Sequence, residues 1–202
     1  MTSNTLRLSL LAASIIAVAA CNKGAASNNT VTSVTTTTTG NSAAATDPTA
    51  SAESAAPASI AHDASIATVD SKGAMTMVRK GSGEWTCMPD NPVTPGTDPM
   101  CFDANAAKWV NAWVHHQTPP EGVVGVIYML EGGTDASNTD PYATKPTADN
   151  DWVNTGPHIM VVGSKDILAG HPAGAKPDTS APYVMWAGTP YAHLMIPVAA
   201  PK

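Results

Sequence analysis

The sequence predicts an α+β domain in which an antiparallel or mixed sheet carries one main amphipathic helix on a face, preceded by a disordered tether. Short apolar segments bounded by glycine and proline recur after residue 60, which is typical of strands. One segment, residues 104–117, has apolar residues at helical spacing instead. Residues 22–59 are rich in Ala, Ser, Thr and Asn and lack aromatic residues, so they cannot bury enough apolar surface to fold. A β-sandwich with a helical insertion is the alternative architecture.

The charge composition argues against one class of partner. Charged residues make up 13% of the 202 residues, the formal net charge is −6, and no run of Lys or Arg occurs. Proteins that bind nucleic acid carry a basic patch that neutralises phosphates. We therefore expect no nucleic-acid partner.

The first twenty residues have the pattern of a signal peptide. Residues 8–20 form a run of 13 residues that is apolar apart from two serines, which is too short to cross a bilayer comfortably. The run ends in Val18-Ala19-Ala20, directly before Cys21. Ordinary cleavage after Ala20, with no special role for Cys21, is one interpretation of this ending.

The small residues before Cys21 also resemble the lipobox of bacterial lipoproteins. The resemblance implies that residues 1–20 are removed and that Cys21 receives several acyl chains, which together give stable membrane anchoring. Asn22 follows the cysteine, where lipoproteins kept at the inner membrane often carry Asp, so the resemblance favours the outer membrane facing the periplasm. Residues 21–59 would then be a lipid-anchored disordered linker with a span of roughly 35 Å. Residues 60–202 would be a single globular periplasmic domain.

The three cysteines are an odd number, which needs an explanation in an exported chain. Lipidation of Cys21 leaves Cys87 and Cys101 as a pair, and export places this pair where a disulfide persists. A disulfide that closes a loop of about fifteen residues contributes roughly 3 kcal/mol to stability. The alternative is a metal clip formed by these thiolates with Met88 and Met100, because soft sulfur ligands select Cu(I).

The middle of the domain predicts a hairpin followed by a helix. Residues 74–80 and 84–88 flank Gly81-Ser82-Gly83, as in a β-hairpin with a glycine turn. Asp103 or Asn105 can cap the helix that follows. Its apolar stripe, at positions i, i+3, i+4, i+7 and i+8, consists of Ala106, Trp109, Val110, Trp113 and Val114. His115 and His116 are expected to cap the last carbonyl groups before Pro119-Pro120 ends the helix.

The C-terminal half predicts further strands at residues 123–130, 158–162, 183–186 and 191–198. The first of these is short and apolar throughout, as in a central strand that is covered on both faces. Residues 131–156 are rich in turn-forming residues and form a long loop, which is either functional or packed on itself.

Two of these strands share the pattern His-x-Met, at His158-Ile-Met160 and His193-Leu-Met195. Residues i and i+2 of a strand face the same way, so each strand would present an imidazole beside a thioether. If the two strands are neighbours, these four side chains converge as a Cu(I) site. The pattern resembles part of the binding pattern of periplasmic copper chaperones, whose other motifs the chain lacks. The alternative is that the methionines fill the core and each imidazole donates to a backbone carbonyl.

The loop at 131–156 carries Asp135, Asn138 and Asp140, whose oxygens suit calcium, although Asx-turns explain the composition equally well. A hydrolase built on this loop would use His158 as a base, with Asp135 or Asp140 as its partner. The sequence contains no nucleophile elbow, phosphate loop, zinc-protease motif or dinucleotide fingerprint. It therefore favours a non-enzymatic protein without deciding the question.

Four stretches of the domain resemble a group of uncharacterised secreted bacterial proteins: Trp85-Thr-Cys-Met-Pro-Asp90, Asp98-Pro-Met-Cys-Phe-Asp103, Ser137-Asn-Thr-Asp-Pro-Tyr142 and Gly156-Pro-His-Ile-Met160. This resemblance supports the domain boundary and implies no activity. The leading interpretation is a lipid-anchored bacterial cell-envelope protein that is not an enzyme and needs no cofactor. Copper binding and hydrolysis are the two alternatives.

Overall fold

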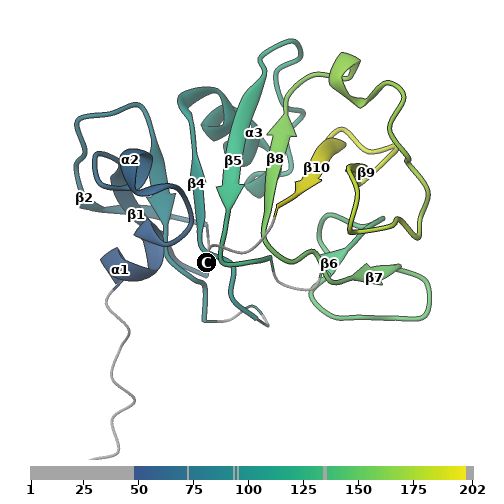
Figure 1. The fold of residues 1–202 in the computed structure, drawn as a ribbon, viewed down its shortest axis with the longest axis horizontal. Coiled ribbons are helices and arrows are strands. Elements are labelled where there is room, and N and C mark those ends of the chain that lie inside the picture. The colour runs from purple at the N-terminus through teal and green to yellow at the C-terminus, as the bar shows by residue number, and fades with distance from the viewer. Residues whose placement is uncertain (1–47, 72, 93, 95, 134–135, 199–202) are drawn as a thin grey trace, which may run out of the picture. The chain divides into compact units, whose positions relative to one another are not determined.

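The computed structural model describes residues 48–71, 73–92, 94, 96–133 and 136–198 (Figure 1). The predicted signal peptide at 1–20, the predicted lipid anchor at Cys21 and the predicted linker as far as residue 47 lie outside these residues.

An eight-stranded sheet forms the centre of the described part of the chain (Figure 1). The strand order is β2-β1-β3-β4-β5-β8-β10-β9, and all neighbours are antiparallel except β1 and β3. The strands are β1 (Ser65–Val69), β2 (Met75–Arg79), β3 (Thr86–Met88), β4 (Met100–Phe102), β5 (Gly125–Met129), β8 (His158–Val162), β9 (Tyr183–Met185) and β10 (His193–Pro197). This architecture confirms the predicted α+β class with a mixed sheet.

The predicted hairpin between residues 74–80 and 84–88 is wrong. β2 and β3 each pair with β1, a strand that the sequence pattern did not reveal. The chain passes from β2 to β3 around the start of β1, where the amides of Ser82 and Gly83 donate to the carbonyl of Asp63 at 3.0 and 3.1 Å. A side chain at Gly81 would overlap the backbone of Asp63, so the glycine serves this close crossing rather than a hairpin turn.

The helix α3 (Ala104–Val114) covers one face of the sheet, as its apolar stripe predicts (Figure 1). Asp103 caps the helix, because its Oδ1 accepts bonds from the amides of Asn105 and Ala106 at 3.0 and 2.7 Å. The helix packs closely on β5 at Gly125, where a Cβ would overlap the backbone of Ala106. The glycine therefore sets how closely the helix approaches the sheet.

The two histidines after α3 have different roles. The ring Nδ1 of His115 lies 2.8 Å from the carbonyl of Asn111, which is the capping bond that the sequence predicts. His116 instead adopts a left-handed backbone conformation with φ of 56°, and its ring stacks on Tyr142 at a centroid distance of 4.0 Å. This conformation ends the helix at Val114, before the predicted residue 117.

Two short helices, α1 (Pro48–Glu53) and α2 (Ala58–Ala61), cover the opposite face of the sheet. Their buried residues pack against the first strands in a cluster formed by Ala52, Ala55, Ala56, Ala61, Ala64, Ile66, Cys87 and Cys101. The predicted disordered linker is therefore too long, since residues 48–59 belong to the folded domain. Alanine-rich composition is misleading here, because small side chains let the helices lie close to the sheet.

Arg79 links α1 and α2 to the edge strand β2. Its Nη1 pairs with the carboxylate of Glu53 in α1. Its Nη2 donates to the carbonyls of Ala61 and Ala64 at 3.0 and 3.1 Å, at the end of α2 and just beyond it. One guanidinium thus joins three segments that are separated in the sequence.

The predicted disulfide between Cys87 and Cys101 is present. The two residues are directly opposite each other on β3 and β4, and their Cα atoms are 4.0 Å apart. Neighbouring residues of a strand point to opposite faces, so Met88 and Met100 face α3 while the cysteines face α1. The alternative metal clip of these four sulfur atoms is therefore wrong.

The long loop at 131–156 packs on itself. Its ends form a small hairpin of β6 (Ala136–Ser137) and β7 (Trp152–Val153), and the Ser137 hydroxyl donates to the carbonyl of Asn150. A 3-10 helix, η1 (Asp166–Leu168), follows β8. Within the residues that the structure describes, no helix is long and apolar enough to cross a membrane.

Candidate functional site

The two His-x-Met segments lie on neighbouring strands and face α3. Met160 on β8 is directly opposite Met195 on β10, and His158 is opposite Pro197. His193 lies two residues before Met195, on the side of the Met pair away from His158. The continued register places it opposite Val162. The strands therefore bring all four predicted ligands to one face of the sheet.

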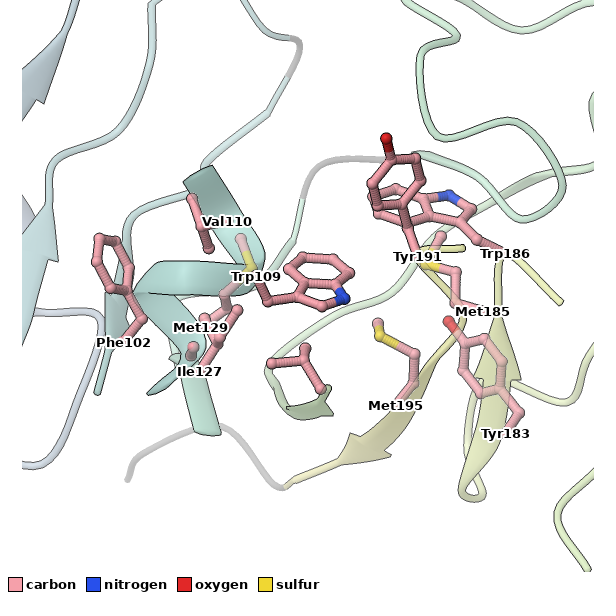
Figure 2. Close-up of a cluster of buried hydrophobic side chains, with 12 residues drawn as sticks. Phe102, Trp109, Val110, Ile127, Met129, Tyr183, Met185, Trp186, Tyr191 and Met195 are labelled. Carbon is pink, nitrogen blue, oxygen red and sulfur yellow. The ribbon is translucent and has the colours of Figure 1, made fainter. Parts of the chain in front are cut away.

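These four side chains line a cavity of about 140 Å³ between the sheet and α3. The other soft and aromatic side chains around it are Met100, Met129, Met185, Trp109, Trp113 and Trp186. Figure 2 shows the Trp109 indole reaching from the helix towards Met195, with Trp186 and Met185 beyond it. The walls are thus mainly thioether and indole groups.

Each histidine is oriented by a backbone carbonyl. The Nδ1 of His158 lies 2.7 Å from the Gly156 carbonyl, and the Nδ1 of His193 lies 2.9 Å from the Tyr191 carbonyl. A carbonyl only accepts hydrogen bonds, so Nδ1 carries the proton and Nε2 keeps its lone pair. This tautomer is the one that a histidine uses to bind a metal through Nε2.

Both histidines are neutral at pH 7. Burial lowers the pKa of His193 to about 4, against the opposing effect of its bond to the Tyr191 carbonyl. Burial also lowers the pKa of His158. His193 is 1% exposed, and its Nε2 has no hydrogen-bond partner. A buried lone pair without a partner is unfavourable, so this atom is suited to a ligand that the cavity would hold.

The predicted convergence of all four side chains on one point is only partly met. His158 and His193 are on neighbouring strands and are offset by four residues, which is about 13 Å along the strand direction. The Met160–Met195 pair lies between them. Each imidazole is therefore a closer neighbour of the methionine pair than of the other imidazole.

A metal in this cavity would depend on thioethers. Among the described residues, no group of three or more His, Cys, Asp or Glu side chains could hold a metal ion. His193 is directly opposite Met185 on β9 and contacts two indoles, with the ring centroids of Trp186 and Trp109 at 4.9 and 5.3 Å. Such a donor set is soft and uncharged.

The cavity is narrow at its far end, where His158 lies. A Cβ at Gly133 would overlap Thr155 Oγ1 and would come within 2.7 Å of the His158 ring. The Thr155 hydroxyl is itself buried and has no hydrogen-bond partner. Gly133 therefore leaves the space that the His158 ring occupies.

The catalytic pair expected in the 131–156 loop is not formed by the described residues. The Nδ1–H of His158 donates to the Gly156 carbonyl and not to a carboxylate, whereas exposed Asp140 accepts from the amide of Tyr142 at 2.9 Å. Asp135 lies outside the described residues. The Asn138 amide donates to the carbonyls of Gly174 and Ala175, both at 3.0 Å. These bonds agree with turns and loop anchoring rather than with hydrolysis or a calcium site.

The sequence analysis missed Met100, Met129 and Met185, along with the three tryptophans, as parts of one cavity. Met129, Met185 and the tryptophans lie within segments that the pattern predicted as strands or helix, whereas Met100 lies on β4, which it did not predict. Their gathering depends on which strands are neighbours and in which register, and such long-range pairing leaves no local signal.

No family model, no curated protein and no solved structure matches the chain. The cavity must therefore be interpreted from its own chemistry.

Proposed function

We propose that the chain is a lipid-anchored, non-enzymatic protein of the bacterial cell envelope whose periplasmic domain binds Cu(I). The residues before Cys21 support the anchor and the outer-membrane location. The cavity lined by His158, Met160, His193 and Met195 supports the ligand.

The observation that carries the copper proposal is the buried, unpartnered Nε2 of His193 beside the facing thioethers of Met160 and Met195. Soft thioether ligands select Cu(I), and imidazole is a good accompanying ligand. Zn²⁺ favours sets of thiolates, imidazoles and carboxylates, and Mg²⁺ favours oxygen ligands, but no group of three or more His, Cys, Asp or Glu in the described residues could hold such an ion. We assign Met160, Met195 and His193 as the inner ligands, with His158 at the far end of the cavity.

The binding test is a competition for Cu(I) with a colorimetric chelator under anaerobic conditions with ascorbate. The double variant Met160→Leu, Met195→Leu keeps the volume of the core, so it should fold while losing about a hundredfold in affinity. Met77→Leu is the matched control, because Met77 is 53% exposed on β2 and does not line the cavity. Equal affinities in the double variant and the wild type would overturn the copper assignment.

The anchor is tested separately by metabolic labelling with an acyl-chain probe. Labelling should be lost in Cys21→Ser and retained in Cys87→Ala, Cys101→Ala. Unchanged labelling of Cys21→Ser would show that the chain is not a lipoprotein of this type.

A second candidate ligand is a small apolar molecule, which the three indoles and the cavity volume favour. A dry cavity of about 150 Å³ in another protein binds benzene. Quenching of tryptophan fluorescence by small aromatic compounds tests this candidate. The same double variant separates the two candidates, because Met160→Leu, Met195→Leu should weaken copper binding about a hundredfold and leave aromatic binding intact.

A further inference from the structure

We propose that a row of methionines, Met88, Met100 and Met129, passes Cu(I) between a groove lined by the exposed Met75 and the inner cavity between the sheet and α3. This inference rests on the proposed copper function and adds to it a route of exchange. The protein would therefore be a carrier that gives up and receives the ion, rather than a closed storage site.

The row follows from the register of four neighbouring strands. Met88 on β3 is directly opposite Met100 on β4. The β4–β5 register, continued by one residue beyond Cys101↔Tyr128, places Met100 opposite Met129. Met129 is in turn directly opposite His158 on β8. Directly opposed residues have Cβ atoms about 5 Å apart, so each sulfur has the next donor within reach.

The outer end of the row lies in a groove of about 590 Å³ between the β1–β2 end of the sheet and α3. Met75, Met88 and Met100 line this groove, and Met75 is 53% exposed. Met100 lines both the groove and the inner cavity. It is therefore the methionine at which the two spaces meet, beside Asp98, Val110 and Trp113, which also line both.

Asp98 also lines both spaces. Its two carboxylate oxygens accept bonds from the Asn91 amide and the Thr94 hydroxyl, at 3.0 and 2.7 Å, which hold it in place. A fixed negative charge at the junction attracts a cation into the row.

The distribution of methionine in the described residues is selective. Of eight methionines there, seven line the groove or the cavity, namely Met75, Met88, Met100, Met129, Met160, Met185 and Met195. Met77 is the exception. A core that only needed filling would place leucine and isoleucine at such positions as readily as methionine.

The transfer itself is a ligand exchange. A thioether sulfur donates a lone pair to the ion as the preceding sulfur withdraws its own, so the ion stays Cu(I) and no electron moves. Thioethers carry no proton at any ordinary pH, so no proton has to leave. A Cu(I) ion that enters this apolar space loses its water ligands, which is unfavourable. Successive sulfur ligands replace these waters one after another.

The test is the rate at which preloaded wild-type domain gives Cu(I) to an excess of a strong chelator, followed by stopped-flow absorbance. Met88→Leu lies in the groove and outside the inner cavity, so it should slow both loading and release by about tenfold. The equilibrium affinity should stay unchanged, because a ligand along the route changes only the barrier. Met75→Leu should slow exchange less, and Met77→Leu should not change it.

The outcomes separate the two proposals. Copper binding that depends on Met160 and Met195, with exchange rates unaffected by Met88→Leu, would overturn the row and leave the copper site standing. Absence of Cu(I) binding by the wild type would overturn both. A drop in affinity in Met88→Leu, measured on protein with native circular dichroism, would also count against the row, since it would make Met88 a binding ligand.

Discussion

Met160 and Met195 face each other across β8 and β10, at the centre of a cavity whose two histidines lie at opposite ends. Met195 is 1% exposed, and the pair is flanked by Ile127 on β5 and Tyr183 on β9. The thioethers therefore form the middle of the cavity floor, with one imidazole towards each end. The following predictions test this arrangement and the fold that creates it.

Gly133→Ala should weaken Cu(I) binding with only a small loss of stability. The added methyl overlaps Thr155 Oγ1 and presses on the His158 ring, so the ring must move away from the cavity. We expect about a tenfold loss of affinity in the chelator competition. Gly174→Ala is the control, because nothing lies within 4 Å of a Cβ at that position. Unchanged affinity in Gly133→Ala would remove His158 from the site.

Gly125→Ala should destabilise the whole domain. The methyl overlaps the backbone of Ala106, which cannot shift without moving α3 off the sheet. Overpacking of this kind is expected to lower the free energy of unfolding by about 3 kcal/mol. Urea denaturation followed by tryptophan fluorescence measures it. A loss below about 1 kcal/mol would mean that the helix sits further from β5 than described.

Arg79→Met should loosen α1 and α2 from the edge of the sheet. The change removes the pair with Glu53 and the bonds to the carbonyls of Ala61 and Ala64, while the apolar stem is kept. Because the guanidinium is about a third exposed, we expect a loss of about 1–2 kcal/mol. Hydrogen exchange should accelerate in residues 48–64 before it does in α3. Uniform acceleration across the domain would contradict this local role.

Stability should fall on acidification because His193 is buried in its neutral form. The unfolded chain takes up this proton near pH 6.5, whereas the folded pKa is lowered to about 4 by burial. Between these values the unfolded state binds more protons, so the stability present at neutral pH is lost as the pH falls. The loss is on the order of 3 kcal/mol for this group, and His158 acts in the same direction.

Urea denaturation at pH 7.5 and pH 5 measures this dependence. The variant His193→Gln cannot titrate, so its stability should change less between the two values. If the free energy of unfolding changed equally with pH in the variant and the wild type, a group other than His193 would cause the acid sensitivity.

Removal of the disulfide in Cys87→Ala, Cys101→Ala should lower the free energy of unfolding by about 3 kcal/mol. The affinity for Cu(I) should be unchanged, because the cysteines face α1 and not the cavity. Thiol titration of the unreduced domain should find neither residue reactive. Loss of copper binding by a folded double variant would contradict the separation of the two faces.

Local patterns predicted a large part of this fold. β8 has the predicted bounds of residues 158–162, and α3 begins at Ala104 behind its Asp103 cap. Both have a strong local cause, apolar strand character in one case and a capped apolar stripe in the other. The pairing of β2 and β3 with β1 was missed because glycines that suit a turn also suit a close crossing. The helices α1 and α2 were missed because their alanines bury little area and resemble linker composition.

The site, like the fold, was predicted in part from local patterns. The period of a strand places His158 beside Met160 and His193 beside Met195, and the two strands are neighbours. The offset between the strands decides that the methionines face each other and that the histidines do not. That offset is set by loops and by packing against α3, so no short stretch of sequence encodes it.

The exposure of β2 gives the domain a graded response to oxidants. Thioethers are converted to sulfoxides according to their accessibility, and Met75 and Met77 are each 53% exposed while Met195 is 1% exposed. Peroxide should therefore modify the edge strand first, which peptide mapping by mass spectrometry can follow. A sulfoxide at Met75 removes the outermost sulfur and leaves Met160 and Met195 intact. Under mild oxidative stress the domain would then keep its ion and release it more slowly.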